Sequence, residues 1–559
     1  MTRLAILGID GATYRIIRPM IADGELPHIA RMLREGASAN LESTIPPITP
    51  PAWVSMMTGV NPGRHGIYHF VHRTIGSYQL GLVDSKNFAG MDAFSLLSRR
   101  GWTTGGFAVP MTYPPFPVNG YMVSGIPMPL KGEAGAWPEG TWAEMEKFIG
   151  KDYEPDINYA AYDGKNEPGS EDLDRYEKLR DDLFRVERER LDLKMEWLRR
   201  HPTDFYFCVM SITDRCQHYF WKFQDRTHDG WSQEGEDRFG EVIKDAYRLS
   251  DEAVGRFREL LGEDCVVSLV SDHGFGTFSA DFFINRWLED EGYLSIKKIP
   301  RWTLGVTNLG DMLRRARLGF ITKILPGPIR RLPVARPKHK KQRDKRDIDW
   351  KNTKVFAAMY GLCLNLKGRE PEGTVEQGAE REALEQEVIA KLRKLRDPLN
   401  NELAVDDAIV SKDCYSGEYL QTAPDIQFMM QGLACLPKED LEAKTHFGRR
   451  KYAAVSGTHR MDGIFAVAGG PNCPTKSGSV YDDMHIQDSL PTLLHMVGEE
   501  IPKWMEGNVQ ADALDPQWLA ANEPQFSDEE IQRGVADGNT WSDEESKRIE
   551  ESLKGLGYL

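Results

Sequence analysis

Three short apolar runs, far apart in the chain, each lead into an aspartate. The runs are LAILGI at 4–9, YFCVMSI at 206–212 and CVVSLVS at 265–271, and they precede Asp10, Asp214 and Asp272. Continuous apolar runs of this length are typical of strands buried on both faces of a parallel sheet. Parallel strands end at one edge of the sheet, where open α/β sheets bind their ligands. We therefore expect the three aspartates to gather at one sheet edge.

Long amphipathic stretches separate these runs. Residues 173–200 and 241–262 have apolar side chains at helical spacing, and a fourth apolar run, GIFAVAG at 463–469, resembles the other three. Strands that alternate with helices are typical of a parallel sheet covered by helices. The predicted fold class is α/β, with a mostly parallel central sheet, all four runs as parallel strands, and helices on both faces.

Composition divides the chain into a core, an insertion and a tail. We assign 1–300 to the first part of the core, 301–350 to a basic insertion, 351–501 to the second part of the core and 502–559 to an acidic, helical C-terminal tail. Two helix starts are expected in the tail, at FSDEEIQ and WSDEESKRIEE, because Ser followed three residues later by Glu forms a capping box.

The overall composition narrows the choice of partners and location. The formal net charge of -15 argues against a general nucleic-acid binder, so no nucleic-acid polymer is expected as a partner. No uncharged apolar stretch reaches the ~18 residues of a spanning helix. The 7 cysteines lack CxxC spacing and fit reduced thiols, which favours a cytoplasmic protein.

One window departs from this acidic balance. Residues 301–347 contain 14 Lys or Arg against 3 Asp. The window fits a basic amphipathic helix at an anionic membrane surface followed by a flexible loop, which would make the protein peripheral at the membrane. It fits equally a solvated insertion between core elements.

A single threonine, Thr49, stands in a proline-rich stretch, IPPITPPAWVSMMTG, at 45–59. Prolines stiffen the segment, and the spacing of Trp53, Met56 and Met57 predicts a helix from about Ala52. A hydroxyl at a helix N-terminus lies among unpaired N–H groups that favour anions. Taken alone, Thr49 fits a capping residue or a nucleophile for a phosphoryl group.

Three histidines accompany the three aspartates. His218 follows Asp214 by four residues, His273 follows Asp272 directly, and His459 lies in SGTHRMDG. Mixed carboxylate and imidazole ligands suit Zn²⁺, and also Mn²⁺ or Fe. Six ligands exceed one tetrahedral site but fit two. Two metals about 3.5–4 Å apart can hold the attacking and leaving sides of a phosphoryl displacement, and a metal can activate a threonine hydroxyl.

The ordered motifs GIDGA, TPPAWVSMMTGVNPGRHGI, DxxxH, SDHG and GTH resemble the alkaline phosphatase superfamily, and within it the type I phosphodiesterase/nucleotide pyrophosphatase group. The resemblance implies an alkaline phosphatase-like fold and two divalent metals, zinc first and manganese second. It implies that Asp10, Thr49, Asp272 and His273 hold one metal. It further implies that Asp214, His218 and His459 hold the other, with Thr49 as the nucleophile between them.

The chain departs from the group's pattern around the nucleophile. The group commonly has Phe-Pro-Asn after the threonine and an Asn after HGI, whereas this chain has PPA at 50–52 and YHF at 68–70. A phosphate contact is therefore missing or is supplied elsewhere, with Arg64, His69 and Arg73 as candidates that also fit structural roles. Sulfatases share the scaffold but require Cys or Ser at the nucleophile position, so sulfatase activity is not expected.

Three functions remain for test. The first is a two-metal hydrolase that cleaves phosphodiester or pyrophosphate bonds of a small-molecule or lipid-linked phosphoester through a phosphothreonine intermediate. The second is a phosphomonoesterase or phosphotransferase acting on a lipid- or glycan-linked phosphate at the membrane surface. The third is a non-catalytic scaffold that keeps the fold.

Overall fold

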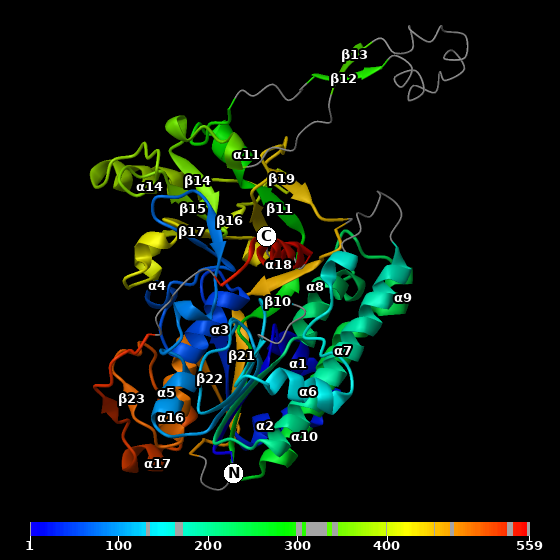
Figure 1. Ribbon diagram of the computed structural model, residues 1–559, viewed down its shortest axis with the longest axis vertical. Coiled ribbons are helices and arrows are strands. Elements are labelled where there is room, and N and C mark those ends of the chain that lie inside the picture. The colour runs from blue at the N-terminus through cyan, green and yellow to red at the C-terminus, as the bar shows by residue number, and fades with distance from the viewer. Residues whose placement is uncertain are drawn as a thin grey trace.

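In the computed structural model of this protein, a large helix-flanked sheet lies beside a smaller β-rich part, drawn at the top of Figure 1. The structure describes residues 2–129, 135–162, 172–297, 304–308, 333–337, 345–398, 400–451, 453–469, 474–533 and 540–555. Most of the predicted basic insertion, 301–350, and of the basic window 301–347 therefore lies outside the described residues. Among the described helices, none combines the length and the apolar character needed to cross a bilayer.

The central sheet has nine strands. In spatial order these are β22 (Ser479–His485), β2 (Ala37–Glu42), β21 (Asp462–Ala468), β9 (Val266–Val270), β1 (Leu4–Ile9), β8 (Phe205–Met210), β5 (Thr104–Val109), β6 (Gly120–Ser124) and β7 (Ala136–Trp137). Strands β9, β1, β8, β5 and β6 pair in parallel, as do β22 and β2. The prediction of a mostly parallel sheet is confirmed.

Strand β21, the fourth apolar run, was wrongly predicted to be parallel. It pairs antiparallel with both β9 and β2. The direction of β21 is related to the position of His459 in the chain. His459 lies before β21, whereas Asp10, Asp214 and Asp272 lie after their strands. The reversed strand brings its leading end to the edge where the parallel strands finish, so His459 can join the aspartates.

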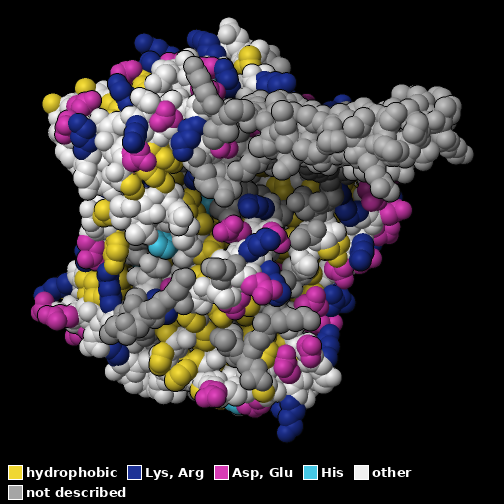
Figure 2. All heavy atoms as spheres, turned by 45° about the horizontal axis from the view of Figure 1, so that its top comes forward, with side chains coloured by type: hydrophobic (Ala, Val, Ile, Leu, Met, Phe, Trp, Pro, Cys, Tyr) yellow, Lys and Arg dark blue, Asp and Glu magenta, His cyan; other side chains and the backbone are white. Residues whose placement is uncertain are grey.

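Both faces of the sheet are covered. In β1, Ala5, Leu7 and Ile9 belong to one apolar cluster and Leu4 and Ile6 to another, as strand alternation requires. The first cluster includes α2 (Pro27–Glu35), α7 (Leu173–Arg200), α8 (Ile212–Gln224) and α10 (Val242–Leu261), and the second includes α3 (Thr49–Thr58), α5 (Ala93–Arg99) and α16 (Ser489–Met496). The charged sides of the helices face solvent, and Figure 2 shows such side chains crowding the right-hand edge, where Figure 1 places α7 and α9 (Gln233–Phe239).

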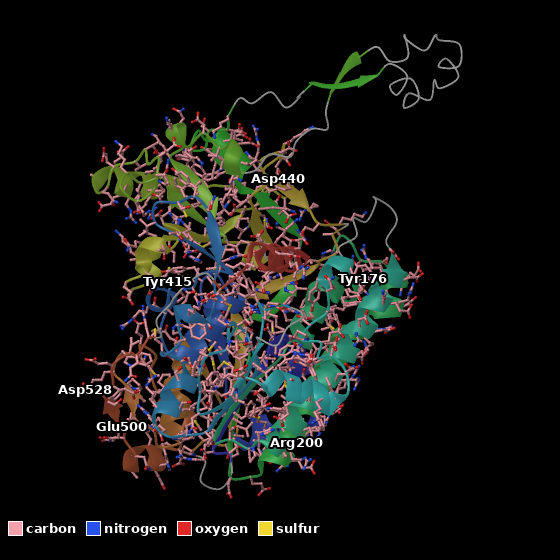
Figure 3. All side chains as sticks on the ribbon, in the orientation of Figure 1. Tyr176, Arg200, Tyr415, Asp440, Glu500 and Asp528 are labelled. Carbon is pink, nitrogen blue, oxygen red and sulfur yellow. The ribbon has the colours of Figure 1, made fainter. Side chains whose placement is uncertain are left out.

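A second part of the molecule, here called the cap, has its own apolar cluster. Its sheet contains β14 (Val355–Ala358), β15 (Gly361–Leu364), β17 (Ile426–Met430) and β16 (Val405–Val410), accompanied by α11 (Ile284–Asp290) and α14 (Ala379–Leu392). Tyr415, labelled in Figure 3, packs against Tyr68 with ring centroids 5.4 Å apart. This contact joins the cap to the loop after α4 (Pro62–His65).

The C-terminal tail contains one of the two predicted helices. WSDEESKRIEE forms α18 (Asp543–Gly555), and the Ser542 and Glu545 side chains each accept a hydrogen bond from the other residue's backbone N–H. The prediction of a helix at FSDEEIQ was wrong. Its first residues form β24 (Phe526–Ser527), which pairs with β23 (Ile501–Pro502) and is thereby held extended.

A buried ion-pair network fixes the cap to the core. Arg73 follows the loop after α4 and pairs with Glu370, and Arg369 pairs with both Glu370 and Asp425. The Arg73 guanidinium also donates to the Ala423 carbonyl at 3.0 Å. Buried charges are tolerated only where they are paired and hydrogen-bonded.

Replacement of Arg73 by methionine should lower the free energy of unfolding by about 3 kcal/mol, because Glu370 keeps its burial but loses one partner. The matched control is Arg199→Met, which removes an exposed pair with Glu196 and should leave stability nearly unchanged. Urea unfolding followed by circular dichroism measures both. Equal small effects for the two variants would show that the Arg73 pair does not stabilise the cap.

Candidate metal centre

The six predicted ligands converge at one edge of the central sheet. Asp10, Asp214, Asp272, His218, His273 and His459 are all buried. Two overlapping groups of ligand atoms lie within 4.8 Å of one another, one formed by Asp10, Asp272 and His273, and the other by Asp214, His273 and His459. The structure thus brings together residues that span 450 positions of the chain, as the strand-end pattern predicts.

The first group matches the ligands expected for one metal. His273 Nε2 lies 3.2 Å from Asp272 Oδ2 and 3.7 Å from Asp10 Oδ1. These carboxylate oxygens and this ring nitrogen have no hydrogen-bond partner among the described residues. Buried polar atoms without a partner cost free energy, so their alignment around a common point fits a cation that would bind them together.

The second group extends the first. Asp214 Oδ1 lies 3.4 Å from His218 Nε2 and 3.6 Å from His459 Nε2, and the two ring nitrogens are 3.2 Å apart. The His273 and His459 rings stack with centroids 3.6 Å apart. This stacking places the two expected ligand sets directly beside each other, and His273 is close enough to belong to either.

Each histidine is oriented by a backbone carbonyl. The Nδ1–H groups of His218, His273 and His459 donate to the carbonyls of Gly457, Gly274 and Pro47, at 3.1, 3.1 and 2.9 Å. A carbonyl only accepts, so each Nδ1 carries a proton, and the other ring nitrogen, Nε2, faces the cluster. This is the arrangement that metal-binding imidazoles require.

Burial and mutual repulsion dominate the electrostatics. Burial, together with the charge of Asp214, raises the pKa of Asp10 to about 8. Burial likewise raises the pKa of Asp272 well above its usual range and lowers the pKa of His459. In contrast, the neighbouring His218 holds the pKa of Asp214 well below its usual range. The metal-free cluster therefore retains protons on Asp10 and Asp272, and a divalent cation would displace those protons.

Thr49 is the first residue of α3 and is buried. Two residues before it, the Pro47 carbonyl accepts from His459, and four residues after it, Trp53 Nε1–H donates to Asp10 Oδ2 at 3.2 Å. These contacts tie the chain on either side of Thr49 to both ligand groups. The backbone on both sides of Thr49 is thereby fixed to the cluster, and the role of Thr49 as nucleophile stays a prediction.

The helix N-terminus itself offers fewer donors than predicted. The helix begins at Thr49, not Ala52, because prolines fit the first helical turn. Pro50 and Pro51 carry no N–H, and the Ala52 N–H donates to the Ile48 carbonyl at 3.3 Å. Stabilisation of a phosphoryl oxygen by several N–H groups of this helix is therefore excluded.

Two supporting residues were missed by the sequence analysis. Trp53 was counted only as a helix-face residue, although it lies one helical turn after Thr49. Arg215 lies inside the DxxxH motif and donates to Asp214 Oδ2 at 2.8 Å, while its other terminal nitrogen approaches Asp156 at 3.4 Å. Its position directly after a predicted ligand was the available signal.

The structure gives each of the three candidate phosphate contacts other neighbours. Arg64 approaches Glu506 at 3.8 Å, and Arg73 belongs to the buried ion-pair network of the cap. The His69 ring packs edge-on against Tyr360, and burial lowers the pKa of His69 to about 3, so it is neutral. In this structure Arg64 and Arg73 are engaged by carboxylates, and His69 brings no positive charge for a phosphate.

Removal of Arg215 should impair the centre through Asp214. We expect Arg215→Met to reduce activity or metal affinity about 10–100-fold, with Arg215→Lys intermediate, because ligand orientation depends on such partners. Arg226→Met, which removes an exposed pair with Glu236, is the matched control. Titration of the stripped protein with metal measures the affinity. A normal metal affinity and a normal rate for Arg215→Met would refute the assigned role.

The pH dependence of stability should differ between the protein with and without metal. Asp10 has a raised pKa in the folded protein, so the stripped protein binds more protons when folded and loses stability as pH rises. His273 and His459 have lowered pKa values, so they reduce stability as pH falls, but only below about pH 6.5. Between about pH 6.5 and 8 the carboxylates therefore determine how stability changes with pH.

Melting temperatures of chelator-treated and metal-loaded protein across that interval provide the measurement. The first should fall as pH rises, and less so in Asp10→Asn, whereas the second should not fall because deprotonated ligands bind metal better. Identical curves for the two preparations would contradict the metal centre.

Comparison with known proteins assigns the chain to a family. A search of curated proteins found no match. Similar solved structures include an inactive murine ectonucleotide pyrophosphatase/phosphodiesterase 5 in complex with AMP (11% identity, 89% of this chain and 96% of that chain, TM-score 0.46). They also include the phosphonoacetate hydrolase of Sinorhizobium meliloti 1021 in complex with phosphonoacetate (11%, 89% and 96%, 0.48). The family model for type I phosphodiesterase/nucleotide pyrophosphatase matches residues 4–459, so the chain belongs to this family of metal-dependent hydrolases.

Proposed function

We propose that the protein is a two-metal phosphohydrolase that uses Thr49 as its nucleophile and cleaves phosphodiester or pyrophosphate bonds. One observation carries the proposal. The segment that contains Thr49 is bound at Pro47 to His459 and at Trp53 to Asp10, and these contacts on either side of Thr49 support a hydroxyl that faces both halves of the ligand cluster. The diester or pyrophosphate class follows from family membership.

Two divalent cations, which we propose are Zn²⁺ with Mn²⁺ as the alternative, would supply the charge that activates the hydroxyl and stabilises the phosphoryl oxygens. Asp10, Asp272 and His273 would hold one, and Asp214, His218 and His459 the other. The mixed carboxylate and imidazole set, with its unpartnered oxygens, fits such ions.

The chain's own residues perform the displacement. Thr49 Oγ forms a bond to phosphorus while the bond to the leaving oxygen breaks with its electron pair, and the proton that Thr49 loses ends on that oxygen, which departs as the alcohol or phosphate. The rigid start of α3 fixes the direction of attack. Water then attacks the phosphothreonine from the opposite side and frees Thr49, with one inversion in each step.

The proposal has two further parts, a membrane contact and a location. The first is a peripheral membrane contact through the basic window 301–347, most of which lies outside the described residues. A cytoplasmic location is supported by the thiols, since Cys208, Cys216, Cys265, Cys363, Cys414 and Cys435 are all free.

Substitution of Thr49 tests the mechanism. Thr49→Ala should lower kcat about 10³-fold or more on bis-p-nitrophenyl phosphate because the proposed attacking oxygen is removed, whereas Thr49→Ser should retain part of the rate. Intact-mass analysis of acid-quenched wild type should show a phosphate adduct that Thr49→Ala lacks.

Metal content must be measured for all three proteins, so that lost metal is not mistaken for a lost nucleophile. Full activity in metal-loaded Thr49→Ala would refute the nucleophile. The rate ratio between the diester and p-nitrophenyl phosphate separates a diesterase from a monoesterase.

A further inference from the structure

The Arg215 guanidinium joins the expected metal ligand Asp214 to a second buried carboxylate, that of Asp156. One terminal nitrogen donates to Asp214 Oδ2 at 2.8 Å, and the other donates to Asp156 Oδ2 at 3.4 Å. The remaining oxygen, Asp214 Oδ1, lies 3.4 Å from His218 Nε2 and 3.6 Å from His459 Nε2. Arg215 therefore determines which oxygen of Asp214 faces the other ligands, and Asp156 can determine the direction of Arg215.

Asp156 is itself held in one orientation. Its Oδ1 accepts a hydrogen bond from the Ile157 backbone N–H and another from the Tyr159 hydroxyl, both at 2.8 Å. The other oxygen, Oδ2, is the one that Arg215 approaches. A planar guanidinium with a carboxylate at each terminal nitrogen keeps one direction, because it cannot rotate without breaking a contact.

Segment 153–162, which carries Asp156, packs on helix α8, which carries Asp214. The Tyr159 ring stacks on the ring of Tyr219, with centroids 6.1 Å apart and an angle of 6° between the planes. Tyr219 follows Arg215 by one turn of α8, and the Arg215 guanidinium carbon lies 5.4 Å from the centre of the Tyr159 ring. Ring stacking and hydrogen bonding thus hold the segment against the part of α8 that carries Arg215.

The C-terminal helix α18, drawn in red near the middle of Figure 1, completes the packing around segment 153–162. It packs against η3 (Tyr159–Ala161), the last part of that segment. Its buried residues Ile549 and Leu553 belong to the apolar cluster that contains Tyr159. Residues four apart lie on the same side of a helix, so α18 presents one apolar side to the cluster.

We propose that Asp156 is a positioning residue for the metal site of Asp214, that it acts through Arg215, and that α18 keeps it in place. The inference rests on the proposed two-metal function for the presence of the cation. Without the Asp156 carboxylate, Arg215 keeps its full charge for Asp214 and loses the contact that fixes its direction. Both changes weaken the hold of Asp214 on a cation. A residue that contributed only to packing would not depend on Arg215 in this way.

A double-mutant cycle tests this dependence, with Zn²⁺ titrated calorimetrically into the chelator-stripped protein. Asp156→Asn should weaken one of two zinc equivalents about 5-fold and leave the other within about twofold, because the partners of ligands tune metal affinity. In the Arg215→Met background the same substitution should have no further effect, since its route to Asp214 is gone. Asp192→Asn, which removes an exposed pair with Arg256, is the matched control and should leave both affinities unchanged.

Two results of the cycle would overturn the proposal. One is an unchanged zinc affinity in Asp156→Asn, and the other is an equal loss of affinity with and without Arg215. If Asp156→Asn is not folded by circular dichroism, Tyr159→Phe removes only the hydroxyl that donates to Asp156 and enters the same cycle.

A matched pair of alanine variants tests the part played by α18. Ile549→Ala should weaken the same zinc equivalent about threefold, and only while Arg215 is present. Leu514→Ala shortens a similarly buried side chain in the other apolar cluster and should leave zinc affinity unchanged. Equal zinc affinities in the two variants would show that α18 does not support the metal site.

Failure of the positioning role and failure of the proposed function give different results. Two bound zinc ions and hydrolysis of bis-p-nitrophenyl phosphate, without coupling between Asp156 and Arg215, overturn the positioning role and keep the hydrolase. Coupling without any hydrolysis keeps the positioning role and overturns the hydrolase. A wild type that binds no zinc overturns both.

Discussion

Mutual repulsion among three buried carboxylates is the constraint on which the rest of the structure depends. Asp10, Asp214 and Asp272 lie in one cluster, and the Arg215 guanidinium is placed directly against Asp214. Without further positive charge such a cluster is stable only if it holds protons. The fold therefore concentrates at one sheet edge an electrostatic cost that divalent cations can remove, and the surrounding structure serves to keep the carboxylates and histidines from relaxing away from it.

The architecture explains how residues far apart in the sequence are held together at one site. Parallel strands β1, β8 and β9 end where their aspartates begin, and the reversed strand β21 brings His459 to the same edge from the other direction. Backbone carbonyls fix the imidazoles, and the helix that begins with Thr49 is attached to the cluster on both sides.

Much of this could be predicted from the sequence because strand ends and motif spacing are local signals. The runs before Asp10, Asp214 and Asp272 predicted the strands and the convergence of these aspartates, and α7 has the bounds expected for it. The reversal of β21 and the use of Arg73 within the cap were not predictable, because strand direction and ion pairing depend on contacts between distant segments. The start of α3 at Thr49 and the strand at Phe526–Ser527 reflect proline geometry and pairing with β23, which override local helix signals.

Anomalous diffraction from crystals of the protein loaded with zinc or manganese tests the central claim most directly. The account predicts two anomalous peaks, one among Asp10, Asp272 and His273 and the other among Asp214, His218 and His459, with the Thr49 hydroxyl between them. Peaks confined to surface residues, or a cluster without bound metal under saturating conditions, would contradict it.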